Sequence, residues 1–334
     1  MRVVKRICML ALGFVLFVAG LLKLMDPVGA GLQMEAYFQF FHLSFLAPLS
    51  EVAAVVFALF ETILGVAVIT GIRRGPVGRI SLILLSFFTL LTFVIWIANP
   101  DMECGCFGEA IHMTHSQSLV KNLVLMVLWA IAFLPYETLE DSPRIKYVSF
   151  WITSVSSVVF LFYSLTDIPL IDYTSLKPGT ELDGASSVSL IDGSGEYCDS
   201  LLTAGRAVVI SVYAPDRLDE SEWSGLDEFA SVVRDAGMKP ILAVSGDPEE
   251  LSLKSAVLAD HRTLMTLNRS NGGATYIADG QVIKKWSSRS LPDRDDLDIL
   301  ASGNPLEAMI SANEPERLKM QGFLLYVFAV MLLL

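Results

Sequence analysis

The sequence predicts an α-helical membrane protein that carries a separate α/β domain outside the bilayer. Of its 334 residues, 53% are hydrophobic and only 18% are charged, and soluble domains carry more charge than this. Long apolar runs, each sufficient to cross a bilayer once, fill the chain as far as about residue 166. Beyond that point, shorter strand-like and helix-like segments alternate with turn residues. The net charge of −12 argues against nucleic-acid binding, because phosphate contacts need clustered Lys and Arg.

The predicted membrane region contains five helices. The first apolar run, 7–22, follows a basic start and lacks a clear cleavage site, which favours an uncleaved span over the alternative of a signal peptide. Segment 28–48 is rich in aromatic residues, as is typical of chain at the headgroup level. The remaining predicted spans lie at about 50–71, 80–98, 118–135 and 147–166.

Basic residues predict the orientation of these helices, because cytoplasmic loops carry an excess of Lys and Arg. They lie before the first helix, between the second and third, and between the fourth and fifth: Arg2, Lys5, Arg6, Arg73, Arg74, Arg79, Arg144 and Lys146. The N-terminus is therefore predicted to be cytoplasmic. The loop 99–117 and residues 167–317 are then predicted to be extracytoplasmic, where thiols can be oxidised.

A polar break between the third and fourth helices holds half of the cysteines and half of the histidines. It runs from Glu103 through Cys104-Gly105-Cys106 to His112 and His115. Two cysteines one residue apart can close a small, strained disulfide, and Gly105 gives the backbone the latitude that closure needs. We interpret Cys104 and Cys106 as an exchanging redox pair.

Two other interpretations of this loop stay open. Cys104, Cys106, His112 and His115 are four soft or borderline ligands within twelve positions, a number that suits zinc or copper. Alternatively, the two cysteines form a structural staple, or stay free, in a loop that only shapes the helix bundle.

Charged and thiol residues elsewhere are judged one at a time. Glu61 lies in the middle of the second span, where charge is costly, and it is a functional candidate with a hydrogen-bonded packing residue as the alternative. Lys23 and Lys121 lie near helix ends and are expected to snorkel or to pair there. Cys8 is expected to pack against neighbouring helices. Cys198 is expected to stay buried or to pair transiently with Cys104 or Cys106.

The region after residue 166 predicts an α/β domain. The pair Asp279-Gly280 between two strand-like runs predicts a hairpin with a type I′ turn. Stretch 167–182, with its Pro and Gly residues, is interpreted as a linker. The predicted order is a strand at 206–213, a helix at 218–236, a strand at 239–244, a helix at 248–259, the hairpin at 274–286 and a helix at 294–312.

The membrane region resembles a known family. Its motifs are Cys104-Gly105-Cys106-Phe107-Gly108, Lys121-Asn122 at the start of the next helix, the segment 19–27 that contains Lys23-Leu24-Met25-Asp26-Pro27, and Glu61. These resemble the DoxX-like and MauE-like membrane proteins over about residues 5–135; MauE is the methylamine-utilisation membrane protein. The resemblance implies a four-helix module tied to thiol or quinone redox. MauE-like members are associated with disulfide formation in an exported enzyme, and DoxX-like members with oxidation of sulfur compounds to quinone.

The outer domain resembles a thioredoxin-like domain of the TlpA type. The resemblance lies in its element order and in Val209 to Pro215, which is similar to the strand before that family's active site. Where the family carries Cys-x-x-Cys, this chain has Arg217-Leu218-Asp219-Glu220. Without thiolates there is no disulfide exchange, so this domain is expected to bind or dock rather than to react.

Together these inferences predict a bacterial inner-membrane protein that crosses the bilayer several times. Its function is predicted to be extracytoplasmic thiol/disulfide or quinone-linked redox, as a component of a membrane thiol-disulfide/quinone oxidoreductase, with quinone as the suggested cofactor. The alternative is a non-catalytic scaffold or assembly protein whose outer domain binds an exported partner. Besides the lipid bilayer, the expected partner is an exported thiol protein or another periplasmic protein. The predicted parts are a four-helix module (1–140), a fifth transmembrane helix (141–166), the linker (167–182), the periplasmic domain (183–315) and a C-terminal transmembrane or anchoring helix (318–334).

Overall fold

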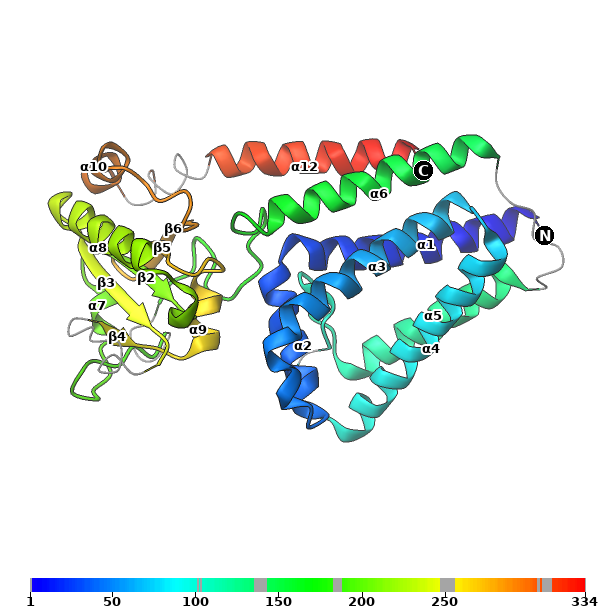
Figure 1. Ribbon diagram of the computed structural model, residues 1–334, viewed down its shortest axis with the longest axis horizontal. Coiled ribbons are helices and arrows are strands. Elements are labelled where there is room, and N and C mark those ends of the chain that lie inside the picture. The colour runs from blue at the N-terminus through cyan, green and yellow to red at the C-terminus, as the bar shows by residue number, and fades with distance from the viewer. Residues whose placement is uncertain are drawn as a thin grey trace. The chain divides into compact units, whose positions relative to one another are not determined.

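The computed structural model describes residues 2–100, 102, 104–134, 143–182, 188–246, 256–304, 307 and 314–333. The chain divides into two compact units (Figure 1). The helical unit comprises Met1–Leu165 and Phe323–Leu334, and the sheet unit comprises Thr166–Gly322. Residues 135–142, on which the end of the predicted four-helix module falls, lie outside the described residues.

The helical unit confirms the five apolar spans. Within the described residues, five helical segments are long and apolar enough to cross a membrane, so the chain is a multi-pass membrane protein. The aromatic segment before the second span forms α2 (Pro27–Phe40) and the short 3₁₀ helix η1 (Ser44–Leu49). The membrane-crossing helices are α1 (Arg2–Met25), α3 (Ser50–Thr70, preceded by η1 in the same span), α4 (Arg74–Ala98), α5 (His115–Phe133) and α6 (Arg144–Ser164).

Small residues bring α1 and α3 into backbone contact. A Cβ atom on Gly65 of α3 would lie 2.4 Å from the Phe17 nitrogen of α1, and one on Gly20 would lie 2.7 Å from the Ala58 carbonyl oxygen. Without a hydrophobic driving force between helices in lipid, such close approach is what allows them to associate. The two helices are therefore positioned closely enough for polar side chains to meet across them.

Hydrogen bonds join α4 to α5, which lie side by side (Figure 1). The Trp129 indole donates to the Gly78 carbonyl at 2.8 Å, and the Asn122 amide donates to the Phe88 carbonyl at 3.2 Å and to the Thr92 hydroxyl at 3.1 Å. These contacts hold together α4 and α5, the two helices on either side of the loop that contains the cysteines.

The C-terminal helix α12 (Glu314–Leu333) does not belong to the five membrane-crossing helices. Its sequence has four charged residues among the first six positions, which shortens the apolar part. The Phe323 ring stacks on Phe160 of α6 with centroids 5.1 Å apart. Anchoring of 318–334 in a membrane stays a prediction.

The sheet unit contains a five-stranded mixed sheet. β2 runs parallel to β3, β3 runs parallel to β4, and β5 runs antiparallel to both β2 and β6. This arrangement is compatible with the predicted thioredoxin-like α/β domain. The strands, in the order β4-β3-β2-β5-β6, are β2 (Arg206–Val212), β3 (Lys239–Val244), β4 (Val257–Leu258), β5 (Gly273–Ala278) and β6 (Gln281–Trp286).

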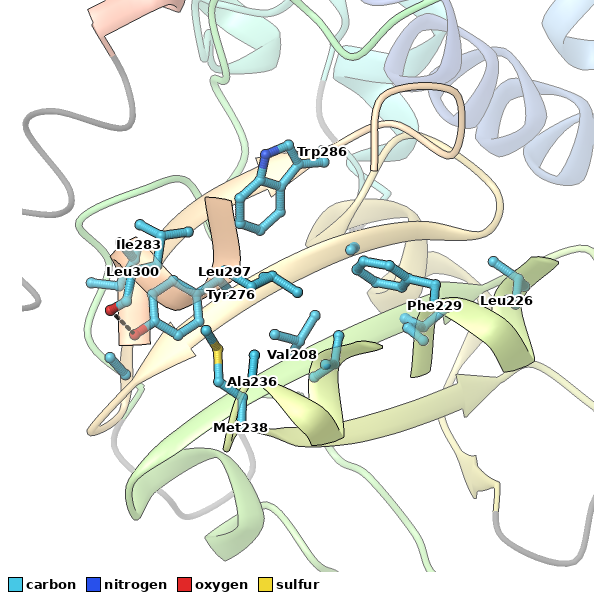
Figure 2. Close-up of a cluster of buried hydrophobic side chains, with 14 of the residues drawn as sticks. Val208, Leu226, Phe229, Ala236, Met238, Tyr276, Ile283, Trp286, Leu297 and Leu300 are labelled. Carbon is cyan, nitrogen blue, oxygen red and sulfur yellow. Dashed lines mark hydrogen bonds between the residues drawn. The ribbon is translucent and has the colours of Figure 1, made fainter. Parts of the chain in front are cut away.

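Side chains on the two faces of the sheet form two hydrophobic cores. Alternate residues of β2 point to opposite faces, so Val208 lies in one core and Val209 in the other. Figure 2 shows the first core, where Phe229 of α8 (Glu220–Asp235) and Leu297 of α10 (Arg294–Ser302) pack with Tyr276. The second core receives residues from α7 (Ser200–Thr203) and α9 (His261–Leu267).

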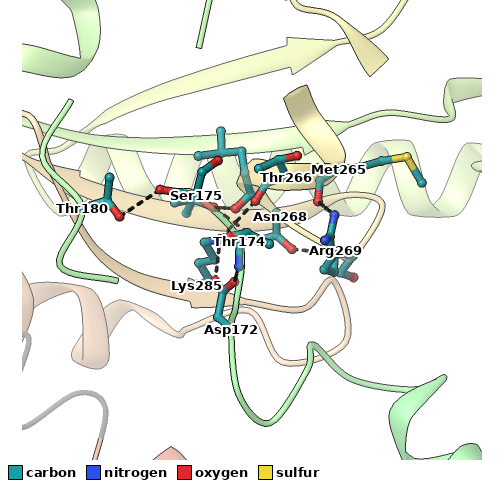
Figure 3. Close-up of polar contacts among 12 residues, drawn as sticks. Asp172, Thr174, Ser175, Thr180, Met265, Thr266, Asn268, Arg269 and Lys285 are labelled. Carbon is teal, nitrogen blue, oxygen red and sulfur yellow. Dashed lines mark hydrogen bonds and ion pairs between the residues drawn. The ribbon is translucent and has the colours of Figure 1, made fainter. Parts of the chain in front are cut away.

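The stretch 167–182 is not a linker. Leu176 and Leu182 are buried in the second core. The Asp172 carboxylate pairs with the buried Lys285 ammonium at 2.7 Å, and Lys285 also donates to the Thr174 hydroxyl at 3.3 Å (Figure 3). Pro178 and Gly179, which suggested a linker, lie in a turn between Leu176 and Leu182, so the stretch is part of the sheet unit.

Two predicted helices differ from the structure. Val257–Leu258, expected within a helix over 248–259, instead forms β4 at the edge of the sheet, and 247–255 lies outside the described residues. Of the helix expected over 294–312, α10 accounts for the part as far as Ser302; Gly303 interrupts it, Glu307 is helical, and 305–306 and 308–312 lie outside the described residues. The hairpin is confirmed, with positive φ angles of 46° at Asp279 and 81° at Gly280 as its turn requires.

Candidate functional site

The cysteine pair lies at the start of the strand β1 (Cys106–Glu109), in the loop between α4 and α5. Both sulfurs are free thiols, and the two Sγ atoms are 3.3 Å apart, within reach of a hydrogen bond. Cys104 is only 2% exposed, whereas Cys106 is partly exposed. Cys106 is therefore the accessible member of the pair. Glu103, which precedes it in the motif, lies outside the described residues.

Helix α2 holds this loop in place. The Tyr37 hydroxyl donates a hydrogen bond to the Cys104 carbonyl oxygen. Gly105 has a φ angle of +58°, and a Cβ atom there would lie 2.4 Å from Oε1 of Gln33. Glycine is thus required twice, by the backbone conformation and by the close approach of α2. The loop conformation that brings the two sulfurs together depends on both features.

The two thiols have opposite proton affinities. The hydrogen bond from Cys104, followed by the positive charges of Lys121 and Lys23, lowers the pKa of Cys106 to about 5 against the opposing effect of burial. The hydrogen bond with Cys106, burial and the negative charge of its neighbour raise the pKa of Cys104 above its usual range. These opposite directions favour a thiolate at Cys106, the nucleophilic form, over one at Cys104.

The cations beside Cys106 come from two helices. Lys121, near the start of α5, lies over the Phe107 ring with its Nζ atom 4.9 Å from the ring centroid. Lys23, near the end of α1, pairs with Glu61 of α3 at 2.7 Å, and both side chains are largely buried. Lys23 was expected to snorkel or pair near its helix end, and it pairs. In the described part of the chain, Glu61 contacts Lys23 and neither sulfur, so its direct role is to hold Lys23.

An apolar cavity of about 430 Å³ adjoins the cysteine pair. Its walls come from α2, α3 and α4, and Phe57 and Phe87 stand across from each other with ring centroids 6.3 Å apart. Both rings are partly exposed, at 40% and 49%, on helices long enough to cross a membrane. The cavity therefore has an apolar rim on the surface that would face lipid. Cys104, Cys106, Lys23 and Glu61 all line it.

The predicted histidine ligands do not join the cysteines. His115 donates from Nε2 to the Met102 carbonyl at 2.8 Å, and its Nδ1 lies 3.3 Å from Oδ1 of Asn99. His112 lines an open surface cavity of about 740 Å³ together with His115, apart from the cavity that the cysteines line. Among the described residues, no three His, Cys, Asp or Glu side chains lie where they could hold a metal ion.

The sheet unit has no thiol pair at the position where thioredoxin-like domains carry one. Residues 215–219 lead into α8, whose first turn Asp219 caps by accepting from the Glu222 backbone. The Asn271 side chain binds both the backbone N–H and the carbonyl of Ala214, at 3.0 and 2.9 Å. Cys198 is the one cysteine of residues 166–322 in the sequence, and burial raises its pKa. Its transient pairing with Cys104 or Cys106 stays a prediction.

Sequence reasoning missed the contribution of α2 to the site. Gln33 and Tyr37 are four residues apart and therefore share one face of that helix, the face that meets the cysteine loop. The signal was the pair of polar side chains at helical spacing within an otherwise apolar and aromatic segment.

The family comparison covers this whole site. Residues 1–135 match the family model described as methylamine utilisation protein MauE, and the match includes the cysteine pair, Lys23, Glu61 and Lys121. No curated protein and no solved structure matches the chain. Over residues 1–135, less than half of its length, this multi-pass membrane protein is therefore similar to the MauE family.

Proposed function

We propose that this protein is a membrane thiol–disulfide redox component of the bacterial inner membrane, and that its cysteine pair transfers electrons from an exported thiol protein to a quinone. One observation carries the proposal. Two thiols with sulfurs 3.3 Å apart, of which the more accessible Cys106 has the lowered pKa, line an apolar cavity with a rim on the face that would meet lipid. The N-terminus is cytoplasmic and the cysteine loop extracytoplasmic, as the distribution of basic residues favours.

The proposed reaction has two halves, and each transfers two electrons. In the first half, a thiolate of the exported dithiol attacks the Cys104–Cys106 disulfide at Cys106. A mixed disulfide forms, Cys104 leaves and takes up a proton, and the second thiol of the partner releases the partner as a disulfide. Cys106 is then a thiolate and Cys104 a thiol.

In the second half, the reduced pair re-forms its disulfide and gives two electrons to the quinone. The quinone also takes up two protons and becomes a quinol. The Cys104 thiol supplies one of these protons, and the aqueous phase outside the membrane supplies the other. Lys23 and Lys121 stabilise the Cys106 thiolate between the two halves.

Geometry supports this role over the alternatives for the loop. A metal site would need further ligands, and both ring nitrogens of His115 face protein oxygens. A structural staple would need no cations and no cavity, yet Lys23 and Lys121 act on Cys106 and the cavity reaches both sulfurs. An unpaired buried cation is costly, so the Lys23–Glu61 pair is consistent with a site built around charge.

The test follows quinone reduction by the reduced protein. The intact protein in lipid nanodiscs is reduced, freed of reductant and mixed with a short-chain benzoquinone, whose absorbance loss reports reduction. We expect one equivalent of quinol per protein, with none from Cys106→Ser or Cys104→Ser. A Cys198→Ser variant is the matched control and should react as the unmodified protein does. Quinol formation that persists in Cys106→Ser would refute the proposal.

A scaffold role is the second candidate, because the sheet unit contains one cysteine and cannot form a disulfide within itself. In this role the sheet unit binds an exported partner and presents it for maturation. The test expresses a Cys104→Ser/Cys106→Ser double variant in cells that lack this protein. If the exported partner matures in these cells, the scaffold role is favoured over the redox role. If the partner matures with Cys198→Ser but not with the double variant, the redox role is favoured.

A further inference from the structure

The polar groups that line the cysteine cavity are almost all satisfied within the protein. Lys23 pairs with Glu61, and the Tyr37 hydroxyl donates to the Cys104 carbonyl. Thr92 donates to the Phe88 carbonyl at 2.8 Å, and the two cysteines interact with each other. Gln33 differs: its Nε2 atom is buried and has no hydrogen-bond partner within the described part of the chain.

An unpaired donor at this place needs an explanation, because buried amide N–H groups are rarely left without an acceptor. Gln33 is held against Gly105, whose missing side chain makes room for Oε1. The amide therefore belongs to the wall that carries the cysteines. What the cavity lacks, and a ligand would supply, is a hydrogen-bond acceptor.

The other features of the cavity define the rest of the ligand. Its walls are apolar and aromatic, and it lies within the roughly 300–1,000 Å³ range of small-molecule sites with a volume of about 430 Å³. Access from lipid past Phe57, Phe87 and Leu90 favours a bilayer-soluble molecule, because these side chains are exposed on membrane-crossing helices. An oxidised quinone, the electron acceptor of the proposed function, meets this description, because it is apolar, bilayer-soluble and carries carbonyl acceptors.

We infer that Gln33 is the positioning residue for the quinone: its Nε2 donates a hydrogen bond to one ring carbonyl and holds the ring against the cysteine loop. This inference rests on the proposed function for the identity of the ligand. It adds a residue on α2 that transfers no electron and binds the oxidised acceptor.

The test measures binding separately from electron transfer. Saturation binding of radiolabelled decylubiquinone is determined for the intact protein in nanodiscs, for Gln33→Leu and for Gln33→Glu. The first variant removes the donor, and the second keeps the shape of the side chain but presents a carboxylate to the carbonyl. Loss of one neutral hydrogen bond corresponds to roughly 3- to 10-fold weaker binding, and we expect at least this loss in both variants.

A matched control comes from the same helix. Gln39 is exposed, bonds to Glu35 at 2.6 Å and does not line the cavity, so Gln39→Leu should bind as the unmodified protein does. The alkylation rate of Cys106 reports whether a variant disturbs the cysteine loop. It should stay unchanged in Gln33→Leu, which introduces no charge beside Cys106, whereas the new carboxylate of Gln33→Glu should move Cys106 alkylation to higher pH.

The outcomes test the inference and the proposed function separately. Unchanged affinity in both Gln33 variants, or no saturable binding to the unmodified protein, would overturn the inference. If binding depends on Gln33 but the bound quinone is never reduced, the inference stands and the proposed function fails. If the quinone is reduced at full rate and affinity without Gln33, the proposed function stands and the inference fails.

Discussion

The lowered pKa of Cys106 can be tested by removing the largest cause of its shift. That cause is the hydrogen bond from Cys104, which lowers the pKa of Cys106 more than any neighbouring charge does. Cys104→Ala removes the donor, whereas Cys104→Ser keeps a hydroxyl donor in its place. Both changes are made in a Cys8→Ser/Cys198→Ser background, so that Cys106 is the one remaining thiol.

The magnitude follows from the pKa of Cys106. A thiol with a pKa of about 5 is about 99% thiolate at pH 7, whereas an unperturbed thiol with a pKa of about 8.5 is about 3% thiolate, a roughly 30-fold difference. The pKa of Cys106 is depressed, so the thiolate is present above that pKa and is lost as the pH falls through it. In Cys104→Ala the midpoint should move upward by about one unit or more, and Cys104→Ser should retain most of the depression.

The assay is the alkylation rate of Cys106 by iodoacetamide between pH 4 and 10, followed by intact-protein mass. We expect the rate in Cys104→Ser to reach half its maximum well below pH 8.5, and in Cys104→Ala at clearly higher pH. Identical midpoints in the two variants would refute the role of the hydrogen bond. Midpoints near 8.5 in both would refute the whole electrostatic description of the pair.

Three further predictions concern the surroundings of the site and the sheet unit. Lys121→Gln should raise the midpoint of Cys106 alkylation by about one unit while Lys121→Arg leaves it nearly unchanged, and equal midpoints would contradict a role for the charge. Glu61→Gln leaves Lys23 buried without its partner and should destabilise the protein by about 3–5 kcal/mol in thermal unfolding. Lys23→Met/Glu61→Gln should recover much of this loss, and a double variant no more stable than the single one would count against the pair. Asp199 is buried and accepts hydrogen bonds from three successive backbone N–H groups at 2.6–3.0 Å, so Asp199→Ala should cost about 3 kcal/mol or more and speed hydrogen exchange at residues 188–190. Unchanged exchange there would show that these bonds are dispensable.

The elements of the membrane region could be predicted because each span depends on local composition. An apolar run of about 20 residues has few alternatives to a helix across the bilayer, and the loop with Cys104 and Cys106 was recognisable as a polar break between two such runs. The hairpin at Asp279-Gly280 was predictable for a similar reason, since its turn needs two consecutive residues with positive φ.

The remainder of the site depends on contacts between residues far apart in the sequence. Lys23 and Glu61 are separated by 38 positions and meet because glycines let α1 and α3 approach closely. Gln33 and Tyr37 reach the cysteine loop through the placement of α2, which local composition does not specify. The stretch 167–182 was misinterpreted as a linker because its buried leucines are spaced irregularly among turn residues, and only the sheet gives them a place to pack.

The most direct test of a redox-active pair is the oxidation state of Cys104 and Cys106 in native membranes. Thiol alkylation followed by mass shift is measured before reduction, after reduction and after subsequent addition of quinone. A relay requires that the pair becomes reduced, gains two alkyl groups, and loses that reactivity again when quinone is added. A pair that stays oxidised throughout, or that stays reduced in the presence of quinone, would contradict the account.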